Sequence, residues 1–126
     1  GGRGGVAVEQ TLIDANHRDA PPRDLLSIVM PVHNEREVIP MTHRRVREFG
    51  PTLAGLGLRY ELILVNDGSY DGTTEILDGL AADDEHVRVA HLTRNFGHQA
   101  AVTAGLTLAR GGVVAVMDAD LQDPPE

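Results

Sequence analysis

Two aspartates one residue apart, Asp118 and Asp120, follow an apolar run, and Gln122 comes two residues later. Hard divalent cations such as Mg²⁺ and Mn²⁺ take oxygen ligands from carboxylates and amides, so these three side chains could hold one ion. A D-x-D pair on its own is more often a solvated acidic turn. This pair directly follows an apolar run, and polar residues also follow the three other apolar runs of the chain. That arrangement favours the metal site.

Two further carboxylates also follow apolar runs. Asp67 precedes Gly68, which permits a positive φ in a tight turn. The Asp67 carboxylate could accept hydrogen bonds from a base or a ribose, whereas Asp71 is interpreted as a helix cap. Glu35 could bind ribose hydroxyls. An equally good interpretation is that Glu35 is an acid in the first turn of a helix, where the helix dipole favours a negative charge.

Arg94 is the best candidate for a phosphate contact, because the guanidinium fork matches phosphate oxygens. A surface ion pair is the alternative. His33 has no partner at a spacing typical of metal ligands, so it is interpreted as a residue that positions the backbone.

The elements that must position these residues alternate along the chain. Short, nearly continuous, β-branched runs are typical of strands buried on both faces of a parallel sheet. The segments between them have helical spacing, and strands alternating with helices predict right-handed βαβ units in an open, mostly parallel α/β sheet with flanking helices. The predicted strands are residues 25–32, 60–65, 87–92 and 113–117, and the predicted helices are residues 40–49, 73–82 and 98–109.

Two of the predicted helices have a defined apolar face. The face of the second helix carries Ile76, Leu77 and Leu80, and that of the third carries Ala101, Val102, Leu106 and Ala109. In open α/β sheets, ligands bind beyond the carboxyl ends of the strands. The polar segments 31–35, 66–69, 93–99 and 118–123 should therefore meet at one edge of the sheet.

The bulk composition limits the possible partners. The formal net charge is -8, and aromatic residues make up 3% of the 126 residues with no Trp, so a base-stacking nucleic-acid surface is not expected. An acidic chain that binds a polyanion needs a local device such as a metal ion. The chain has no Cys, no apolar run near the roughly 18 residues of a membrane span and no signal-peptide pattern, so we expect a soluble, cytoplasmic protein.

The length predicts one domain. Residues 1–22 are rich in Gly and Pro and are expected to be a flexible tail, with residues 23–126 forming the folded part. The chain lacks the G-x-G-x-x-G turn of dinucleotide folds, the P-loop pattern and the G-x-S-x-G elbow of hydrolases.

In order and spacing, four motifs resemble the family 2 glycosyltransferases, and most closely the branch of dolichyl-phosphate-mannose synthases and bacterial polyprenyl-phosphate glucosyltransferases. The third and fourth motifs are the more specific to that branch. The motifs are S-I-V-M-P-V-H-N-E (27–35), V-N-D-G-S with D-G-T (65–69 and 71–73), R-N-F-G-H-Q (94–99) and M-D-A-D-L-Q-D-P-P-E (117–126).

The resemblance implies a GT-A fold, whose front half is a Rossmann-like nucleotide-sugar-binding sheet. It implies inverting transfer of one sugar from a nucleotide diphosphate sugar to a polyprenyl phosphate, with Mg²⁺ or Mn²⁺ as cofactor. UDP-glucose is the first expectation for the donor and GDP-mannose the second. Carried over to this chain, the resemblance implies that the nucleoside pocket is lined by Pro31, His33 and Glu35, and that Asp67 contacts the base. It implies that the metal is held by Asp118, Asp120 and Gln122. Near the sugar and the acceptor phosphate it places Arg94, Asn95 and residues 123–126. Asp118, Asp120 and Arg94 are thus the expected catalytic residues.

Three features depart from the family pattern. Position 33 is usually aromatic and is His33 here, and position 112 is often Asp and is Gly112 here. The chain also stops at Glu126, before the acceptor-binding half and the membrane segments of many members. We therefore expect membrane contact, at the cytoplasmic face, through parts absent from this chain. The main alternative function is a module that binds a nucleotide sugar without turnover, and a weaker alternative is a metal-dependent phosphatase. The sequence does not indicate the oligomeric state.

Overall fold

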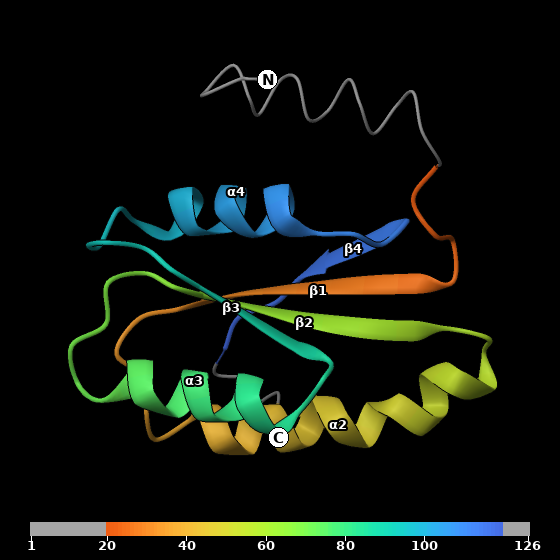
Figure 1. Cartoon of the computed structure of the whole chain (residues 1–126), viewed down its shortest axis with the longest axis horizontal. Helices are drawn as coiled ribbons and strands as arrows, with labels where there is room; N and C mark the ends of the chain where they lie inside the picture. Colours follow the sequence, from red (N-terminus) through yellow and green to blue (C-terminus); the bar gives the residue numbers. More distant parts are fainter. Residues whose placement is uncertain (1–19, 120–126) are drawn as a thin grey trace, which may run out of the picture.

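A computed structural model describes residues 20–119 of the chain, and Figure 1 shows their arrangement. Strands and helices alternate as predicted. The first strand has the predicted bounds, and the other three differ from theirs by one residue at one or both ends. The elements are β1 (Leu25–Val32), α2 (Ile39–Gly55), β2 (Arg59–Asn66), α3 (Thr73–Asp83), β3 (Val87–His91), α4 (His98–Leu108) and β4 (Val113–Val116).

The four strands form one parallel sheet in the order β3-β2-β1-β4. Helix α4 covers one face of this sheet, and α2 and α3 cover the other (Figure 1). This three-layer arrangement confirms the predicted open α/β fold with flanking helices. In a parallel sheet the carboxyl ends of all strands lie at the same edge, so the loops that follow β1, β2, β3 and β4 are neighbours there.

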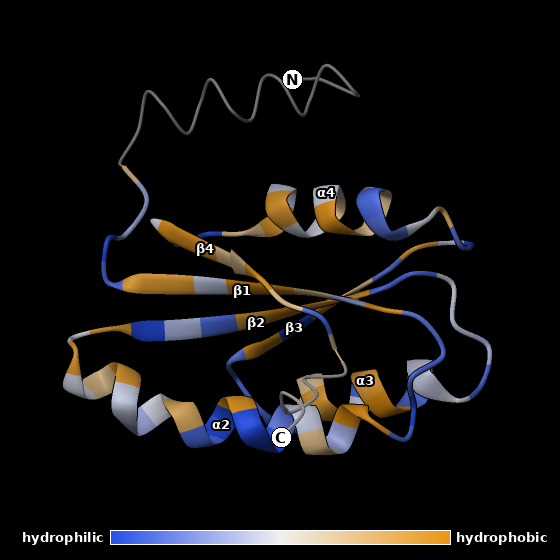
Figure 2. Ribbon diagram, turned by 180° about the vertical axis from the view of Figure 1, so that it is seen from behind, coloured by the Kyte–Doolittle hydropathy of each residue, from blue (hydrophilic) through white to orange (hydrophobic). Residues whose placement is uncertain are grey.

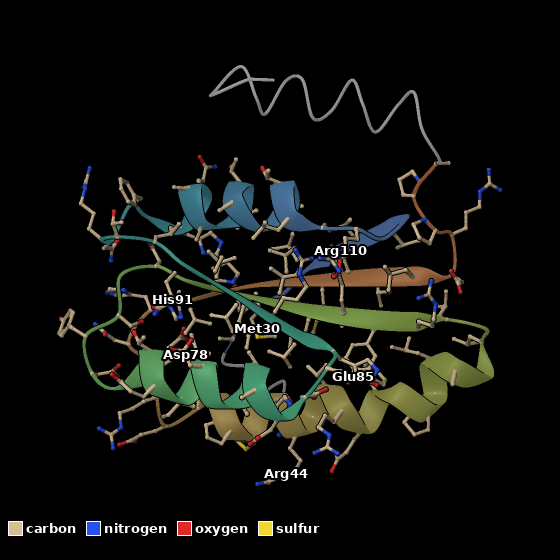
Figure 3. All side chains as sticks on the ribbon, in the orientation of Figure 1. Met30, Arg44, Asp78, Glu85, His91 and Arg110 are labelled. Atoms are coloured by element: carbon tan, nitrogen blue, oxygen red, sulfur yellow. The ribbon has the colours of Figure 1, made fainter. Side chains whose placement is uncertain are left out.

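Alternating side chains of β1 and β2 face the two helical layers, which explains why both strands are apolar throughout. Met30 lies between the sheet and the layer of α2 and α3 (Figure 3), in a cluster with Leu62, Leu64 and Leu77. Val29 packs on the opposite face, in the cluster that contains Ala101 of α4. Figure 2 shows the resulting apolar centre of the sheet, with polar residues in the loops and along α2.

Strand β4 departs from the prediction of burial on both faces. Val113, Val114 and Val116 are 52%, 41% and 46% exposed. Within residues 20–119, β4 pairs with β1 alone and lies at the edge of the sheet, so less of the protein covers it than covers β1.

Two predicted helix features are also corrected. Helix α2 continues past the predicted end at Phe49 and contains Pro51. Proline lacks one N–H donor, but Leu53 on the following turn packs against the core and helps to hold the extra turns in place. In α4, Leu106 is 46% exposed, because the buried face consists of Ala101 and Gly105, whose small size lets the helix approach the sheet closely.

A buried carboxylate fixes the connection from α4 to β4. The Glu61 carboxylate accepts hydrogen bonds from the Ser27 hydroxyl, the Arg110 amide and the Arg88 guanidinium, at 2.6, 2.8 and 2.9 Å. Burial alone would raise the pKa of Glu61, but these three donors together hold it below its usual range. The Gly111 amide donates to the Ser27 hydroxyl at 2.8 Å, so the same cluster sets where β4 begins.

The residue that precedes β4 explains one departure from the family pattern. The Gly112 amide donates to the Pro22 carbonyl at 2.7 Å, and a Cβ atom on Gly112 would lie 2.7 Å from that same oxygen. A side chain at position 112 would therefore clash with the chain entering β1. Pro22, the last residue of the predicted tail, thus contacts the fold, while residues 1–19 lie outside the described part.

Among the helices at residues 20–119, none has the length and apolar character needed to cross a bilayer.

Candidate functional site

A pocket of about 390 Å³ lies at the carboxyl edge of the sheet. Every strand contributes to its wall through the segment that follows it, as the convergence of polar segments predicted. A larger groove of about 830 Å³ lies at the other end of the sheet, between the ends of α2 and α3, away from these polar segments. The residues that line the smaller pocket are Pro31, Val32, His33, Glu35, Asp67, Asn95, Gly97, His98, Asp118 and Ala119.

His33 is at the centre of a hydrogen-bonded group in this wall. Its Nδ1 lies 2.7 Å from the Asp67 carbonyl oxygen, which can only accept, so Nδ1 carries the hydrogen. Its Nε2 lies 3.2 Å from the Asn34 amide nitrogen and 3.1 Å from that of Asn95. The ring thus links the ends of β1 and β2 to the loop before α4, in agreement with the positioning role expected for it.

Asn34 holds the turn that follows β1. Its φ of 52° lies in the left-handed region, which Asn tolerates better than most residues. Its side-chain oxygen accepts from the Tyr70 backbone amide at 2.8 Å, and its backbone amide donates to the Ser69 hydroxyl at 2.9 Å. Because the Asn34 oxygen faces Tyr70, its side-chain nitrogen must face His33.

The three remaining candidates for the nucleoside contact, Pro31, Glu35 and Asp67, are brought together with His33 in the pocket. One Glu35 carboxylate oxygen accepts from the His33 backbone amide at 3.0 Å, which turns this side chain back toward the end of β1. Asp67 is 4% exposed, and its carboxylate accepts from the Phe96 and Gly97 amides at 2.8 and 3.0 Å. Asp67 therefore contacts the β3–α4 loop as well as the pocket.

Asp118 reaches the same pocket from the end of β4, and its side chain is exposed to solvent. The next residue, Ala119, is buried, and its carbonyl accepts a hydrogen bond from the buried hydroxyl of Thr42 on α2. Thr42 thereby ties the segment that carries Asp118 to the helical layer. Asp120 and Gln122, the other predicted metal ligands, lie outside the described residues, as do residues 123–126.

Arg94 is placed differently from the other candidates. Its guanidinium carbon lies 4.1 Å from the centre of the Phe96 ring, a cation–π contact, and Arg94 is not among the residues that line the pocket. Both side chains are exposed on the β3–α4 loop. This contact engages the face of the guanidinium, so its N–H groups stay available to a phosphate.

Sequence reasoning gave no individual role to three residues of this site. Asn34 and Thr42 act through hydrogen bonds to residues 36 and 77 positions away, which no local pattern reveals. His98 lines the pocket as the first residue of α4. Its place in the polar segment 93–99, at the start of a predicted helix, is the signal that could have identified it.

The sequence profile of the family described as glycosyl transferase family 2 matches residues 27–126, which include β2, β3, β4, most of β1 and the pocket. The chain belongs to this family. The match covers the GT-A front half that the motifs indicated, and it explains why polar residues occupy each strand end of this family member.

Curated relatives point to one branch of the family. The chain is 45% identical over 106 residues to an undecaprenyl-phosphate 4-deoxy-4-formamido-L-arabinose transferase of Pseudomonas fluorescens (strain SBW25), covering 83% of this chain and 30% of that protein. It is 43% identical over 101 residues to a prophage bactoprenol glucosyl transferase homolog of Escherichia coli (strain K12), covering 80% of this chain and 32% of that protein. The chain thus spans about a third of the length of these relatives.

A solved structure supports the fold. The mannosyltransferase PcManGT from Pyrobaculum calidifontis, in complex with GDP-Man and Mn²⁺, superposes with a TM-score of 0.63 at 20% identity. The similarity covers 90% of this chain and 35% of that one. At this identity the likeness establishes the GT-A fold of the family 2 chain.

Proposed function

We propose that this family 2 chain carries the donor-binding part of a metal-dependent, inverting glycosyltransferase that moves a sugar from a nucleotide diphosphate sugar to a polyprenyl phosphate. The observation that carries the proposal is the pocket at the carboxyl edge, which collects His33, Glu35, Asp67 and Asp118 from three different strand ends. The names of the Pseudomonas and Escherichia relatives supply the acceptor class.

The donor set at the end of β4 fits a hard divalent cation. Asp118 presents a solvent-exposed carboxylate to the pocket, and Asp120 and Gln122 follow it with the oxygen ligands that Mg²⁺ and Mn²⁺ prefer. Such an ion would neutralise charge on the departing diphosphate. This contribution matters for a chain with a net charge of -8, which otherwise repels a polyanionic substrate.

The acceptor needs little activation by the protein. A phosphomonoester has a second pKa of about 6, so a polyprenyl phosphate is largely a dianion near neutral pH. One of its oxygens attacks the anomeric carbon as the bond from that carbon to the diphosphate breaks, and the configuration inverts. Catalysis then depends on positioning and electrostatics, for which Arg94, Asn95 and residues 123–126 are the proposed acceptor-side groups.

UDP-glucose is our first choice of donor and GDP-mannose the second. The Escherichia relative is named as a glucosyl transferase homolog, which supports glucose. In the cell we place the reaction at the cytoplasmic face of a membrane, where a polyprenyl phosphate is accessible, with membrane contact made by segments beyond this chain.

The alternative is a module that binds the nucleotide sugar and the metal without turnover. The pocket residues Asp67 and Asp118, which are donor-side candidates, would serve such a module equally well. The two are separated by incubating the chain with radiolabelled UDP-glucose or GDP-mannose, Mn²⁺ and detergent-solubilised polyprenyl phosphate, and by measuring donor binding in parallel. Label in the lipid fraction supports the transferase, binding without lipid label supports the module, and failure of both donors to bind contradicts the proposal.

A further inference from the structure

The loop between β3 and α4, residues 92–97, forms one wall of the pocket through Asn95 and Gly97. Consecutive backbone amides of this loop, those of Phe96 and Gly97, donate to the two different carboxylate oxygens of Asp67. Asp67 is 4% exposed, so few water molecules can replace these bonds. Buried amides that lose their acceptor are costly, which makes the loop conformation depend on this one carboxylate.

Backbone packing strengthens the same attachment. Gly68 has a φ of 72°, and a Cβ atom on it would lie 2.3 Å from the Asn95 amide nitrogen and 2.5 Å from the Arg94 carbonyl carbon. The loop therefore rests directly on the turn that carries Asp67. The Asn95 side chain adds a contact to His33, whose ring is itself bonded to the Asp67 carbonyl.

We propose that Asp67 is a positioning residue of the donor site, whose carboxylate holds the β3–α4 loop in place and so sets the pocket wall formed by Asn95 and Gly97. Each carboxylate oxygen keeps a second lone pair, so a nucleotide can still bond to Asp67. The effect on the ligand rests on the proposed function above, whereas the attachment of the loop is a property of the free protein.

The attachment is tested without any ligand by amide hydrogen exchange. Asp67→Asn leaves one oxygen and places an N–H₂ group opposite the second amide donor, so at least one of the two bonds is lost. We expect exchange at Phe96 or Gly97 to accelerate by about tenfold or more, from the usual strength of hydrogen bonds to charged groups. The core amides of Leu62 and Ile63 should exchange at the parent rate.

Two further variants make this result specific. Gly68→Ala keeps the Asp67 carboxylate but pushes the loop away, and it should accelerate exchange at both Phe96 and Gly97. Asp24→Asn is the matched control, because it removes an exposed carboxylate that bonds to Arg59 at the opposite end of the strands from this loop. Parent-like exchange at Phe96 and Gly97 in Asp67→Asn would overturn the proposal, because the carboxylate would then not hold the loop.

A double-mutant cycle tests whether Asp67 acts on the ligand through the loop. Dissociation constants for UDP and GDP with Mn²⁺ are compared among the parent, Asp67→Asn, Asn95→Ala and the double variant. If Asp67 acts by placing Asn95, the double variant has the same nucleotide affinity as whichever single variant binds more weakly. If the two single variants' fold-losses of affinity multiply in the double variant, Asp67 contacts the ligand independently of the loop. A parent that binds neither nucleotide would refute the proposed function, while the exchange experiment would still decide the loop attachment.

Discussion

The side chains of the pocket hold one another in place in the free protein. His33 bonds to the Asp67 carbonyl, to Asn34 and to Asn95, and Asn34 in turn bonds to Ser69 and Tyr70. Such cross-links reduce the conformational freedom that a ligand would otherwise have to remove on binding. The described part of the pocket wall is therefore held in place without a ligand.

Asn34 allows the turn after β1 to be tested in two steps. Asn34→Gly removes the bonds of the side chain but keeps the backbone free to adopt φ 52°. Asn34→Ala removes the same bonds and adds the cost of a left-handed conformation, about 1 kcal/mol or more. Urea denaturation should therefore rank the free energy of unfolding as parent, then Asn34→Gly, then Asn34→Ala. Equal stability of all three would show that this turn does not depend on Asn34.

The metal site has a direct test at Asp120. Asp120→Ala should abolish metal-dependent nucleotide binding and leave the thermal melting of the chain intact, because the side chain that it removes is a proposed metal ligand. The control is Asp83→Ala, which removes an exposed acid at the end of α3 and should bind like the parent. If Asp120→Ala binds UDP or GDP with Mn²⁺ as tightly as the parent, the assigned metal ligands are wrong.

The part of the site that could be predicted from sequence is the part that follows from strand order. Pro31, His33, Glu35, Asp67 and Asp118 all line the pocket because each follows or ends a strand of one parallel sheet. The partners of these residues could not be predicted, since the bond from Thr42 to Ala119 joins elements 77 positions apart. The stacking of Arg94 on Phe96 is likewise a matter of side-chain conformation, which no spacing encodes.

At the scale of elements, apolar runs and turn residues were enough to predict the strands, because β1 and β2 are buried on both faces. The face of α4 was predicted less well. Leu106 is the larger side chain, yet Gly105 faces the sheet, because the helix lies too close to Val29 for a larger residue. A helix can approach a sheet closely only where its residues at the contact are small. A search for apolar periodicity overlooks such glycines because it looks for large apolar side chains.

Helix α4 provides a matched pair of glycine substitutions. A Cβ atom on Gly105 would lie 2.3 Å from Val29 Cγ1, whereas one on Gly79 in α3 meets nothing within 4 Å. Gly105→Ala should therefore lower the free energy of unfolding by about 1–3 kcal/mol through overpacking. Gly79→Ala should raise it by up to about 1 kcal/mol, because alanine favours the helix. Chemical denaturation measures both, and a stabilising Gly105→Ala would contradict the close packing of α4 on β1.

The Glu61 cluster gives the fold a defined pH dependence. The pKa of Glu61 is lower in the folded chain than its usual value, so its contribution is fully present above the unfolded pKa of about 4.3. That contribution is lost as the pH falls through the folded pKa. Glu61→Gln should lose about 1–3 kcal/mol of stability at pH 7 and should lose less further stability than the parent on acidification. Parallel stability curves for the parent and the variant from pH 7 to acid would contradict this account.

The whole molecule combines an acidic chain with a ligand that is expected to be a polyanion. The net charge of -8 opposes diphosphate binding at long range, so binding has to depend on a local positive charge. The proposed ion at Asp118, Asp120 and Gln122 provides it. Nucleotide affinity should therefore depend strongly on the metal.

Thermal melting of the chain with UDP, GDP or ADP, each with Mn²⁺ and with a chelator, tests this claim most directly. A ligand at about a hundred times its dissociation constant adds roughly 2.7 kcal/mol of stability, which amounts to several degrees in a domain of this size. We predict such a rise in Tm for UDP or GDP with Mn²⁺, no rise in chelator and none for ADP. A cooperative melt that no nucleotide shifts, or an equal shift with chelator, would contradict a metal-dependent nucleotide site in this pocket.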